Sequence, residues 1–591
     1  MNLPILNYKK TKLIDLGDIC ENEKEIDHII KVTKLQQYNP LYSVFFHLSQ
    51  SNYDTIQFNN THQIVNLHEI INTTTHITKK ADIFIKYSPL LDPIRYMIGK
   101  YDISNNKIRN LPTLLSNNEN CDKKLLEYNN ASYVDNFFNY LSSVLLNNYH
   151  FSNGIDYYGS FLGIQEKFRM NIEDDLEYLS ESSFFLQNIG KLMTIDNFDK
   201  DSLTKNSRCN KSILILEENV ELTSLDMEDL NLFNKEEENT SMVISIKEID
   251  LSSIKTNDID ITKIHSSTFS STSNSHSSTS TSTSTSTSSH SSCSSNTTLT
   301  SKDNKEEDEE DNDIKEGSSE EDNSEDDSSE DDSNEDDNND AIAYIYDFPV
   351  QLICLERCEG TMDDLFTNNI IDNKNGIAFL FQIVMTLVVY QKVYQFTHND
   401  LHTNNIMFQL TTKKYLYYEH NNISYKVPTY GYLFKIIDFG RSIYKYKGNI
   451  FCSDSFAIDG DGNTQYNCEP FYDESKKKIE PNFSFDLCRL GCSIYDIILD
   501  KPPLNIKNLH SFQKIIIEWV TDDNGRNVVY KKNGSERYPG FKLYKMISRT
   551  VHKNIPEDQL KKSCFQKFKI DKKHIPLREK IINIDLFPIC S

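Results

Sequence analysis

HNDLHTNNIMF (398–408) and FKIIDFG (434–440) are the two stretches that decide the fold. In the first, Asp400 and Asn405 stand five residues apart in a polar segment that runs into the short apolar run NIMF. In the second, Asp438 directly follows an apolar run. Carboxylate and amide oxygens are the ligands that Mg²⁺ prefers in proteins, and a carboxylate can also accept a proton from a hydroxyl group. The two stretches therefore predict a polar site at the ends of two strands.

Both motifs resemble those of the eukaryotic protein-kinase-like superfamily. HNDLHTNN is similar to the catalytic loop HRDxxxxN, and IDFG is similar to the metal-binding DFG segment. The HxDLHxxN form resembles that of haspin-like protein kinases, and the chain looks similar to putative Ser/Thr kinases of large DNA viruses. The resemblance implies a protein kinase that uses ATP and Mg²⁺ to phosphorylate Ser or Thr hydroxyl groups of a protein substrate.

The resemblance also gives the motif residues their expected roles. Asp400 is expected to orient the acceptor hydroxyl and accept its proton, while Asn405 and Asp438 bind Mg²⁺. Phe439 is expected to pack inward. FDLCRLGCSIYDII (485–498) resembles a helix of the same family, in which the aspartate, here Asp486, braces the catalytic-loop backbone, and Gly491 permits close packing.

His402 stands where Ser/Thr kinases usually have a lysine that reaches the γ-phosphate. A free imidazole has a pKa of about 6.5, and a nearby phosphate favours its protonated form. We therefore expect a catalytic role for His402 as a partial substitute for the lysine, with transfer falling as His402 loses its proton. The alternative is that His402 only hydrogen-bonds the loop backbone.

IFIK (83–86) resembles the kinase strand VAIK, whose lysine holds the α- and β-phosphates of ATP. Lys86 takes this expected role. A lysine at this position normally pairs with a glutamate on the following helix, and apolar residues at helical spacing predict that helix over 130–146. The helix offers Asp135 as the partner, and Glu127 is the alternative.

FPVQLICLE (348–356) is predicted to be a strand that leads into the nucleotide hinge. By the resemblance, Leu355 is the gatekeeper, and Glu356 to Cys358 bind adenine through their backbone. An earlier strand is predicted at NGIDYYGSFLGI (153–164).

Three departures from the family pattern leave other functions open. No glycine occurs between Gly17 and Gly99, so the GxGxxG loop that normally covers the phosphates is absent ahead of Lys86, as in a pseudokinase scaffold. Asn399 replaces the arginine that receives a phosphorylated activation loop in most regulated kinases. HND also resembles choline and aminoglycoside kinases, so a small-molecule phosphotransferase remains an alternative.

A long low-complexity insertion interrupts the pattern. From Ser266 to Thr300, 28 of 35 residues are Ser or Thr, and the run from Ser301 to Asp340 holds 22 acidic residues against 3 lysines. Such a segment buries too little apolar surface to offset its ordering entropy, which predicts disorder. The acidic run is a candidate binding surface for basic proteins.

The expected fold is α+β and bilobal, with a strand-rich N-lobe, a helical C-lobe and this insertion. Its parts are an N-terminal extension at 1–26, the first part of the N-lobe at 27–195, the insertion at 196–341, the last N-lobe strand and hinge at 342–358, and the C-lobe at 359–591.

Composition argues against several other classes of protein. The net charge of −26 disfavours nucleic-acid binding, and no CxxC pair indicates a zinc site. The apolar run AFLFQIVMTLVVY (378–390) is too short to span a bilayer and reads as a buried helix, so no membrane insertion is expected. MNLPILNYKK has no signal-peptide pattern, so the expected location is intracellular and cytoplasmic, in the host cell or virion if the protein is viral.

Overall fold

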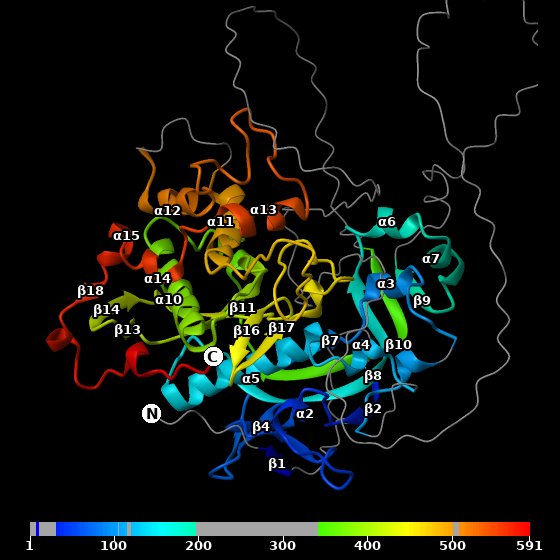
Figure 1. Cartoon of the computed structure of the whole chain (residues 1–591). Helices are drawn as coiled ribbons and strands as arrows, with labels where there is room; N and C mark the ends of the chain where they lie inside the picture. Colours follow the sequence, from blue (N-terminus) through cyan, green and yellow to red (C-terminus); the bar gives the residue numbers. More distant parts are fainter. Residues whose placement is uncertain (1–7, 11–30, 105, 115–119, 197–340, 500–507) are drawn as a thin grey trace, which may run out of the picture. The chain divides into compact units, whose positions relative to one another are not determined.

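The computed structural model describes residues 8–10, 31–104, 106–114, 120–196, 341–499 and 508–591 (Figure 1). Within these residues the chain is α+β, as predicted, and all strand pairings between named strands but one are antiparallel. The Ser/Thr-rich and acidic runs of the predicted insertion lie outside the described residues.

A five-stranded antiparallel sheet organises the first part of the chain. Its strands are, in order, β2 (Val32–Gln36), β8 (Tyr157–Asn171), β10 (Ile342–Glu356) and β7 (Ile83–Pro89), and β9 (Met193–Asp196) also pairs with β10. Most of β8 and nearly all of β10 are buried. Burial on both faces explains why these two strands read as apolar runs rather than as an alternating pattern.

The two chain ends that flank residues 197–340 lie side by side in this sheet. Asp196, the last residue of β9, pairs with Ile342, the first residue of β10. The segment 197–340 therefore connects two neighbouring antiparallel strands.

Helix α5 (Ala131–Tyr149) packs on β8 and β10 (Figure 1). The side chain of Asn130 caps its first turn by accepting a hydrogen bond from the backbone N–H of Ser132, and the left-handed residue His150 ends it. All residues from 132 to 145 are buried, because the helix has packed elements on every side. The helix predicted at 130–146 is confirmed.

Short elements complete the first part of the chain. The strands are β1 (Tyr8–Lys10), which pairs with β3 (Ile56–Phe58), and a three-stranded sheet of β4 (His62–Asn66), β5 (Glu69–Asn72) and β6 (Thr78–Lys80). The helices are α2 (Tyr42–Phe45), α3 (Pro93–Met97), α4 (Lys123–Leu126), α6 (Leu176–Ser180) and α7 (Ser183–Asn188).

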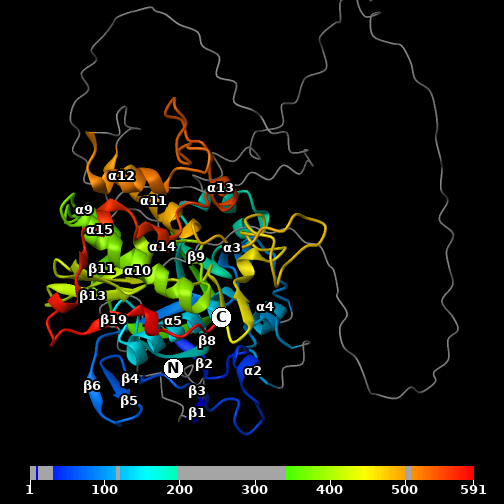
Figure 2. The same ribbon diagram turned by 60° about the vertical axis from the view of Figure 1, so that its left-hand side comes forward.

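Helix α10 (Gly376–Tyr394) lies at the centre of the second part of the chain, with α14 (Pro556–Gln559) and α15 (Ser563–Gln566) beside it (Figure 2). It is long and apolar enough to cross a membrane, but 94% of its most apolar window is buried inside the protein. The prediction of a buried helix is confirmed, because the apolar side chains pack against the surrounding elements. The expectation that the segment is too short to span a bilayer is wrong, because the helix extends beyond 378–390 at both ends.

The hairpin predicted at 414–427 is confirmed as β13 (Tyr415–His420) and β14 (Ile423–Pro428). Its two-residue turn, Asn421 and Asn422, has positive φ at both positions, which asparagine tolerates better than most residues. On its two sides the hairpin pairs with β18 (Lys569–Ile570) and, in parallel, with β19 (Ile581–Asn583).

The remaining elements include more strands than the helical C-lobe predicted from the sequence. The strands are β11 (Gly360–Thr361), β12 (Ile406–Leu410) and β15 (Tyr432–Ile436) in one sheet, and β16 (Ile443–Tyr446) with β17 (Asn449–Cys452) in another. The helices are α9 (Met362–Thr367), α11 (Phe485–Ile498), α12 (Ser511–Trp519) and α13 (Lys542–Thr550).

The predicted helix at 485–498 coincides with α11, and Gly491 has the role expected for it. A Cβ atom at Gly491 would lie 3.0 Å from the Cβ of Trp519 and 3.1 Å from a methyl group of Val520. The glycine thus lets α11 and α12 approach closely.

Candidate active site

Lys86 on β7 joins two carboxylates from distant parts of the chain. Its Nζ lies 2.7 Å from Oδ2 of Asp135 on α5 and 2.8 Å from Oδ1 of Asp438, just beyond β15. The sequence-predicted pair of Lys86 and Asp135 is therefore present. Glu127, the alternative partner, instead accepts a hydrogen bond from the backbone N–H of Asn129.

The surroundings favour the charged forms of Lys86 and Asp438, whereas burial raises the pKa of Asp135. Burial alone would lower the pKa of Lys86, but the two carboxylates outweigh burial and raise it above its usual range. Burial alone would raise the pKa of Asp438, but the ammonium group of Lys86 outweighs burial and lowers it. The Asp438 carboxyl group is therefore ionised, as a carboxylate that binds a cation must be.

The backbone around Asp438 has an unusual conformation, with φ at 62°. A non-glycine residue in this region costs free energy, and such strain concentrates at functional sites. The next residue, Phe439, donates its backbone N–H to Oδ1 of Asp135 over 2.8 Å. The same buried aspartate therefore fixes both Lys86 and the backbone that carries Asp438.

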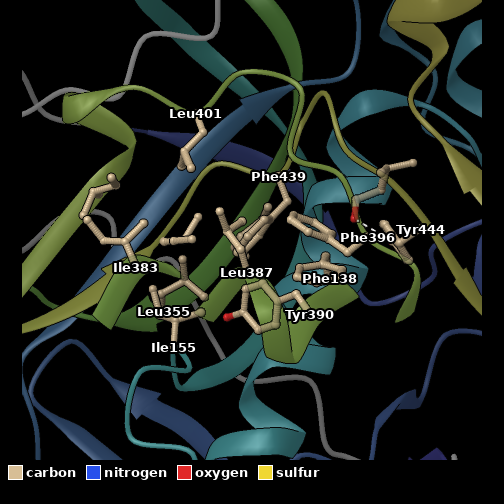
Figure 3. Close-up of a cluster of buried hydrophobic side chains, with 14 of the residues drawn as sticks. Phe138, Ile155, Leu355, Ile383, Leu387, Tyr390, Phe396, Leu401, Phe439 and Tyr444 are labelled. Carbon is tan, nitrogen blue, oxygen red and sulfur yellow. Dashed lines mark hydrogen bonds between the residues drawn. The ribbon is translucent and has the colours of Figure 1, made fainter. Parts of the chain in front are cut away.

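Phe439 packs inward, as expected (Figure 3). Its ring centroid lies 4.6 Å from that of Phe138 on α5 and 5.9 Å from that of Phe396, which follows α10. Figure 3 shows these rings in one cluster with Leu387 and Tyr390 of α10. The packing of the Phe439 ring against α5 and the segment after α10 thus fixes the backbone that directly follows Asp438.

The loop that carries Asp400 is braced by Asp486 on α11, as expected from the resemblance. The backbone N–H groups of His398 and Asn399 each donate to one oxygen of Asp486 over 2.9 Å. Asn399 has a φ of 65°, so a strained backbone occurs here as well. A fully buried carboxylate fixes this turn, because it satisfies two backbone donors at once.

Asn405 and Asp438 lie on neighbouring strand ends. Ile406 of β12 pairs with Ile436 of β15, and the backbone N–H of Ile437 donates to the carbonyl of Asn405 over 3.0 Å. The side-chain amide nitrogen of Asn405 donates to the backbone carbonyl of Asp400 over 2.9 Å, which leaves its amide oxygen to act as an acceptor.

The donor set fits Mg²⁺, which takes oxygen ligands and is usually held by one or two protein groups plus phosphates and water. Asn405 would supply an amide oxygen and Asp438 a carboxylate oxygen. Among the described residues, no cluster of three or more His, Cys, Asp or Glu side chains could hold a metal by itself.

Asp400 lies among positively charged groups. Its Oδ1 accepts a hydrogen bond from the hydroxyl group of Tyr544 over 2.8 Å. Burial alone would raise the pKa of this carboxyl group. Electrostatic attraction from His402, whose ring is protonated in the acid range where Asp400 titrates, and from Arg441 and Arg489 outweighs burial and, with the tyrosine hydrogen bond, lowers the pKa to about 2. The carboxylate is therefore ionised at physiological pH and able to accept a proton.

The expectation of a cationic His402 depends on a bound phosphate, and the protein by itself favours the neutral ring. Burial lowers the pKa of His402 to about 4, and the positive charge of Arg489 acts in the same direction, although Asp400 opposes both. The imidazole is therefore neutral at physiological pH. The partial burial of the ring and the nearby arginine are visible only in the folded chain.

The predicted hinge follows β10, where Leu355 is buried. The side chain of Glu356 is held by Lys435 and accepts the backbone N–H of Asp156 over 2.7 Å. In the described part of the chain, the backbone N–H of Cys358 has no backbone partner, so it can donate to a ligand. Burial raises the pKa of the Cys358 thiol to about 12, so the thiol stays protonated.

β7, which carries Lys86, pairs only with β10 among the described strands. β2, from the earlier part of the chain, pairs with β8 on the other side of the sheet. No described strand hairpin therefore covers the outer edge of β7, in agreement with the missing glycine-rich loop.

The segment after β17 is tied to the start of α5, a feature that the sequence did not reveal. The carboxylate of Asp454 accepts the backbone N–H of Ala131 over 3.0 Å and lies 2.9 Å from Nζ of Lys124. In return, the backbone N–H of Asp454 donates to the carbonyl of Asn129 over 2.8 Å. Further along, Tyr466 donates its hydroxyl proton to the side chain of Asn399 over 2.9 Å.

No family model matches the chain. Over 202 residues the chain is 29% identical to a protein named Uncharacterized protein 098R from Invertebrate iridescent virus 6. The matched region covers 32% of this chain and 30% of the viral protein, so the chain spans less than a third of that relative's length. The printed name of the relative states no activity.

Proposed function

We propose that the protein is an ATP-dependent phosphotransferase of the protein-kinase-like superfamily, with a two-lobed kinase fold and protein Ser or Thr hydroxyl groups as acceptors. The observation that carries the proposal is the contact of Lys86 with both Asp135 and Asp438. A strand, a helix and a strained loop from distant parts of the chain converge there on one largely buried cation. Phosphoryl transfer depends on such fixed charges, because most of its catalysis is positioning and electrostatic stabilisation.

In the proposed reaction the acceptor hydroxyl oxygen attacks the γ-phosphorus of ATP, its proton passes to Asp400, and ADP leaves. Lys86 would hold the α- and β-phosphates, while Asn405 and Asp438 would bind Mg²⁺, which neutralises charge on the phosphates when bound. The low pKa of Asp400 keeps its carboxylate ionised, so that it can orient the hydroxyl group. The backbone N–H of Cys358 would donate to adenine.

One observation favours a second candidate, a nucleotide-binding protein without transferase activity. No described strand covers the edge of β7, where backbone N–H groups would otherwise contact the phosphates. Against this candidate, the groups proposed for proton transfer and metal binding are all present and oriented by hydrogen bonds.

The test is phosphate transfer from labelled ATP by the full-length protein with Mg²⁺, using casein, histones, choline and an aminoglycoside as acceptors. We expect label on protein Ser or Thr. Asp438→Asn should reduce transfer by a factor of roughly 1,000 or more, because it removes the charged metal ligand. Asp558→Asn is the matched control, since the Asp558 side chain is exposed and pairs with Lys561 at the surface.

Thermal melting must show that the Asp438→Asn protein is folded. Wild-type activity in that variant would refute the metal assignment. Nucleotide binding without transfer to any acceptor would favour a nucleotide-binding protein without transferase activity. Label on choline or the aminoglycoside alone would favour a small-molecule kinase.

A further inference from the structure

Helix α11 reaches the candidate active site at two points. Asp486 and Arg489 stand three residues apart and therefore lie on the same face of the helix. Asp486 holds the loop backbone at residues 398 and 399. Arg489 donates its Nε–H to the hydroxyl oxygen of Tyr544 over 3.0 Å. One face of α11 thus contacts both the backbone of the loop that carries Asp400 and the side chain of Tyr544.

The direction of the hydrogen-bond chain is fixed by chemistry. A guanidinium group can only donate, so the hydroxyl oxygen of Tyr544 must accept from Arg489. The hydroxyl proton is then free to be donated to Oδ1 of Asp400, which lies 2.8 Å away and, when ionised, can only accept. The chain therefore runs from Arg489 through Tyr544 to Asp400, with every donor matched to an acceptor.

Packing keeps Tyr544 in this place. Its ring stacks on that of Phe541, with centroids 5.2 Å apart and an angle of 9° between the planes. The guanidinium carbons of Arg489 and Arg441 lie 5.2 and 5.9 Å from the ring centroid. Contacts on several sides leave the ring little freedom, so the hydroxyl group is presented to Asp400 in one position.

The arrangement leaves half of the carboxylate available. No described residue donates a hydrogen bond to Oδ2 of Asp400. A carboxylate that is held through one oxygen has a defined plane, and its second oxygen then points in a defined direction. An acceptor hydroxyl that approaches Oδ2 would meet a preoriented group rather than a rotating one.

We infer that Tyr544 and Arg489 are positioning residues of the transferase site, which fix the orientation of Asp400 for the acceptor hydroxyl. The inference rests on the proposed function and extends it to two residues outside the motifs. The competing possibility is that the Tyr544 hydroxyl group occupies the place of the acceptor hydroxyl at Asp400 and keeps the acceptor out. Removing the tyrosine hydroxyl would slow transfer if Tyr544 positions Asp400, and would speed transfer if Tyr544 keeps the acceptor out.

The test is Tyr544→Phe, which removes one hydroxyl group and keeps the ring. We expect kcat to fall roughly 10- to 100-fold, the usual effect of losing a hydrogen bond to a charged group, while KM for ATP stays unchanged. A merely structural role would not separate kcat from KM in this way. Tyr530→Phe is the matched control, because it removes a 2.7 Å hydrogen bond from Tyr530 to Asp496 at an exposed site.

Unchanged kcat in Tyr544→Phe would overturn the inference, and increased kcat would show that the tyrosine blocks the acceptor. Either result leaves the proposed function intact, whereas the proposed function itself fails if the wild-type protein transfers phosphate to no acceptor. A double-mutant cycle of Tyr544→Phe with Asp400→Ala, which removes the acceptor oxygen, is measured by thermal melting and needs no activity. Purely additive losses in melting temperature would show that the hydrogen bond does not form, and this too would overturn the inference.

Discussion

His402 shows how the surroundings of one partly buried ring can change the expected chemistry of a motif. In an unfolded chain its pKa is about 6.5, and in the folded protein burial lowers the pKa to about 4. Between these two values the unfolded chain binds a proton that the folded protein excludes. The contribution of His402 to the unfolding free energy is therefore largest above about pH 6.5. It decreases as the pH falls toward 4, because the unfolded chain takes up the proton first.

We predict that His402→Gln weakens this acid sensitivity. The wild-type protein should lose on the order of 1–3 kcal/mol of unfolding free energy through His402 between pH 7 and pH 4, and the variant should lack that part of the loss. Urea unfolding at several pH values measures the difference. His68→Gln, at an exposed histidine, is the control and should behave as the wild type. Equal pH dependence in His402→Gln and the wild type would contradict the burial of a neutral ring.

The contacts among motif residues could be predicted from the sequence, but the contacts outside the motifs could not. Lys86, Asp135 and Asp486 have the partners or roles that the family pattern implies. The pattern fixes them because motif residues stand at set positions on predictable strands and helices. Tyr544 lies 144 residues from Asp400, in a helix that carries no motif, so no local signal indicates their hydrogen bond.

At the scale of elements, long regular segments could be predicted and short ones could not. Helices α5, α10 and α11 and the hairpin of β13 and β14 have clear apolar spacing or turn residues. Strands β11, β18 and β19 are two or three residues long. Their pairing depends on distant partners, and so few residues carry no periodic pattern.

The link from Asp454 to the start of α5 is an element-scale feature with a functional consequence. In many kinases a phosphorylated residue orders the segment after the metal-binding motif. Here a carboxylate binds Lys124 and the first N–H of α5, the helix that also carries Asp135. The segment after β17 is thus tied to the helix that positions Lys86 without any modification.

We predict that Asp454→Asn lowers the unfolding free energy by about 1–2 kcal/mol, because it removes the charge that pairs with Lys124 at a largely buried position. Phosphate transfer should fall as well, since α5 positions Asp135. Urea unfolding and hydrogen exchange at residues 129–135 measure the two effects. Asp459→Asn is the control, because the Asp459 side chain is exposed and lies 3.4 Å from Arg95. Wild-type exchange at 129–135 in Asp454→Asn would contradict this role.

At the scale of the whole molecule, the sequence predicts an insertion at 196–341, in which low complexity dominates soon after Asp250, and residues 197–340 lie outside the described residues. What composition could not reveal is the pairing of Asp196 with Ile342 across this gap. Two residues that are far apart in the sequence are brought together by β9 and β10.

This pairing allows a quantitative test of whether residues 197–340 contribute to the folded core. The cost of closing a loop grows by roughly 0.6 kcal/mol for each doubling of its length. If these residues add no packing, as composition predicts for 266–340, then a shorter connection should raise the unfolding free energy. Replacing 197–340 by Asn-Gly leaves a three-residue loop, Asn-Gly-Ala341, between the paired residues, which suits a hairpin.

We predict a rise of up to roughly 3 kcal/mol for this replacement, because the loop shortens by between five and six doublings. Deleting only 266–340 halves the loop and should raise the unfolding free energy by roughly 0.6 kcal/mol. Both proteins should keep the phosphate transfer of the wild type, since no residue of the candidate site lies in the deleted part. Urea unfolding of the three proteins measures the series. A loss of unfolding free energy that grows with the length removed would show that residues 197–340 pack against the core, because loop closure alone can only favour the shorter chains.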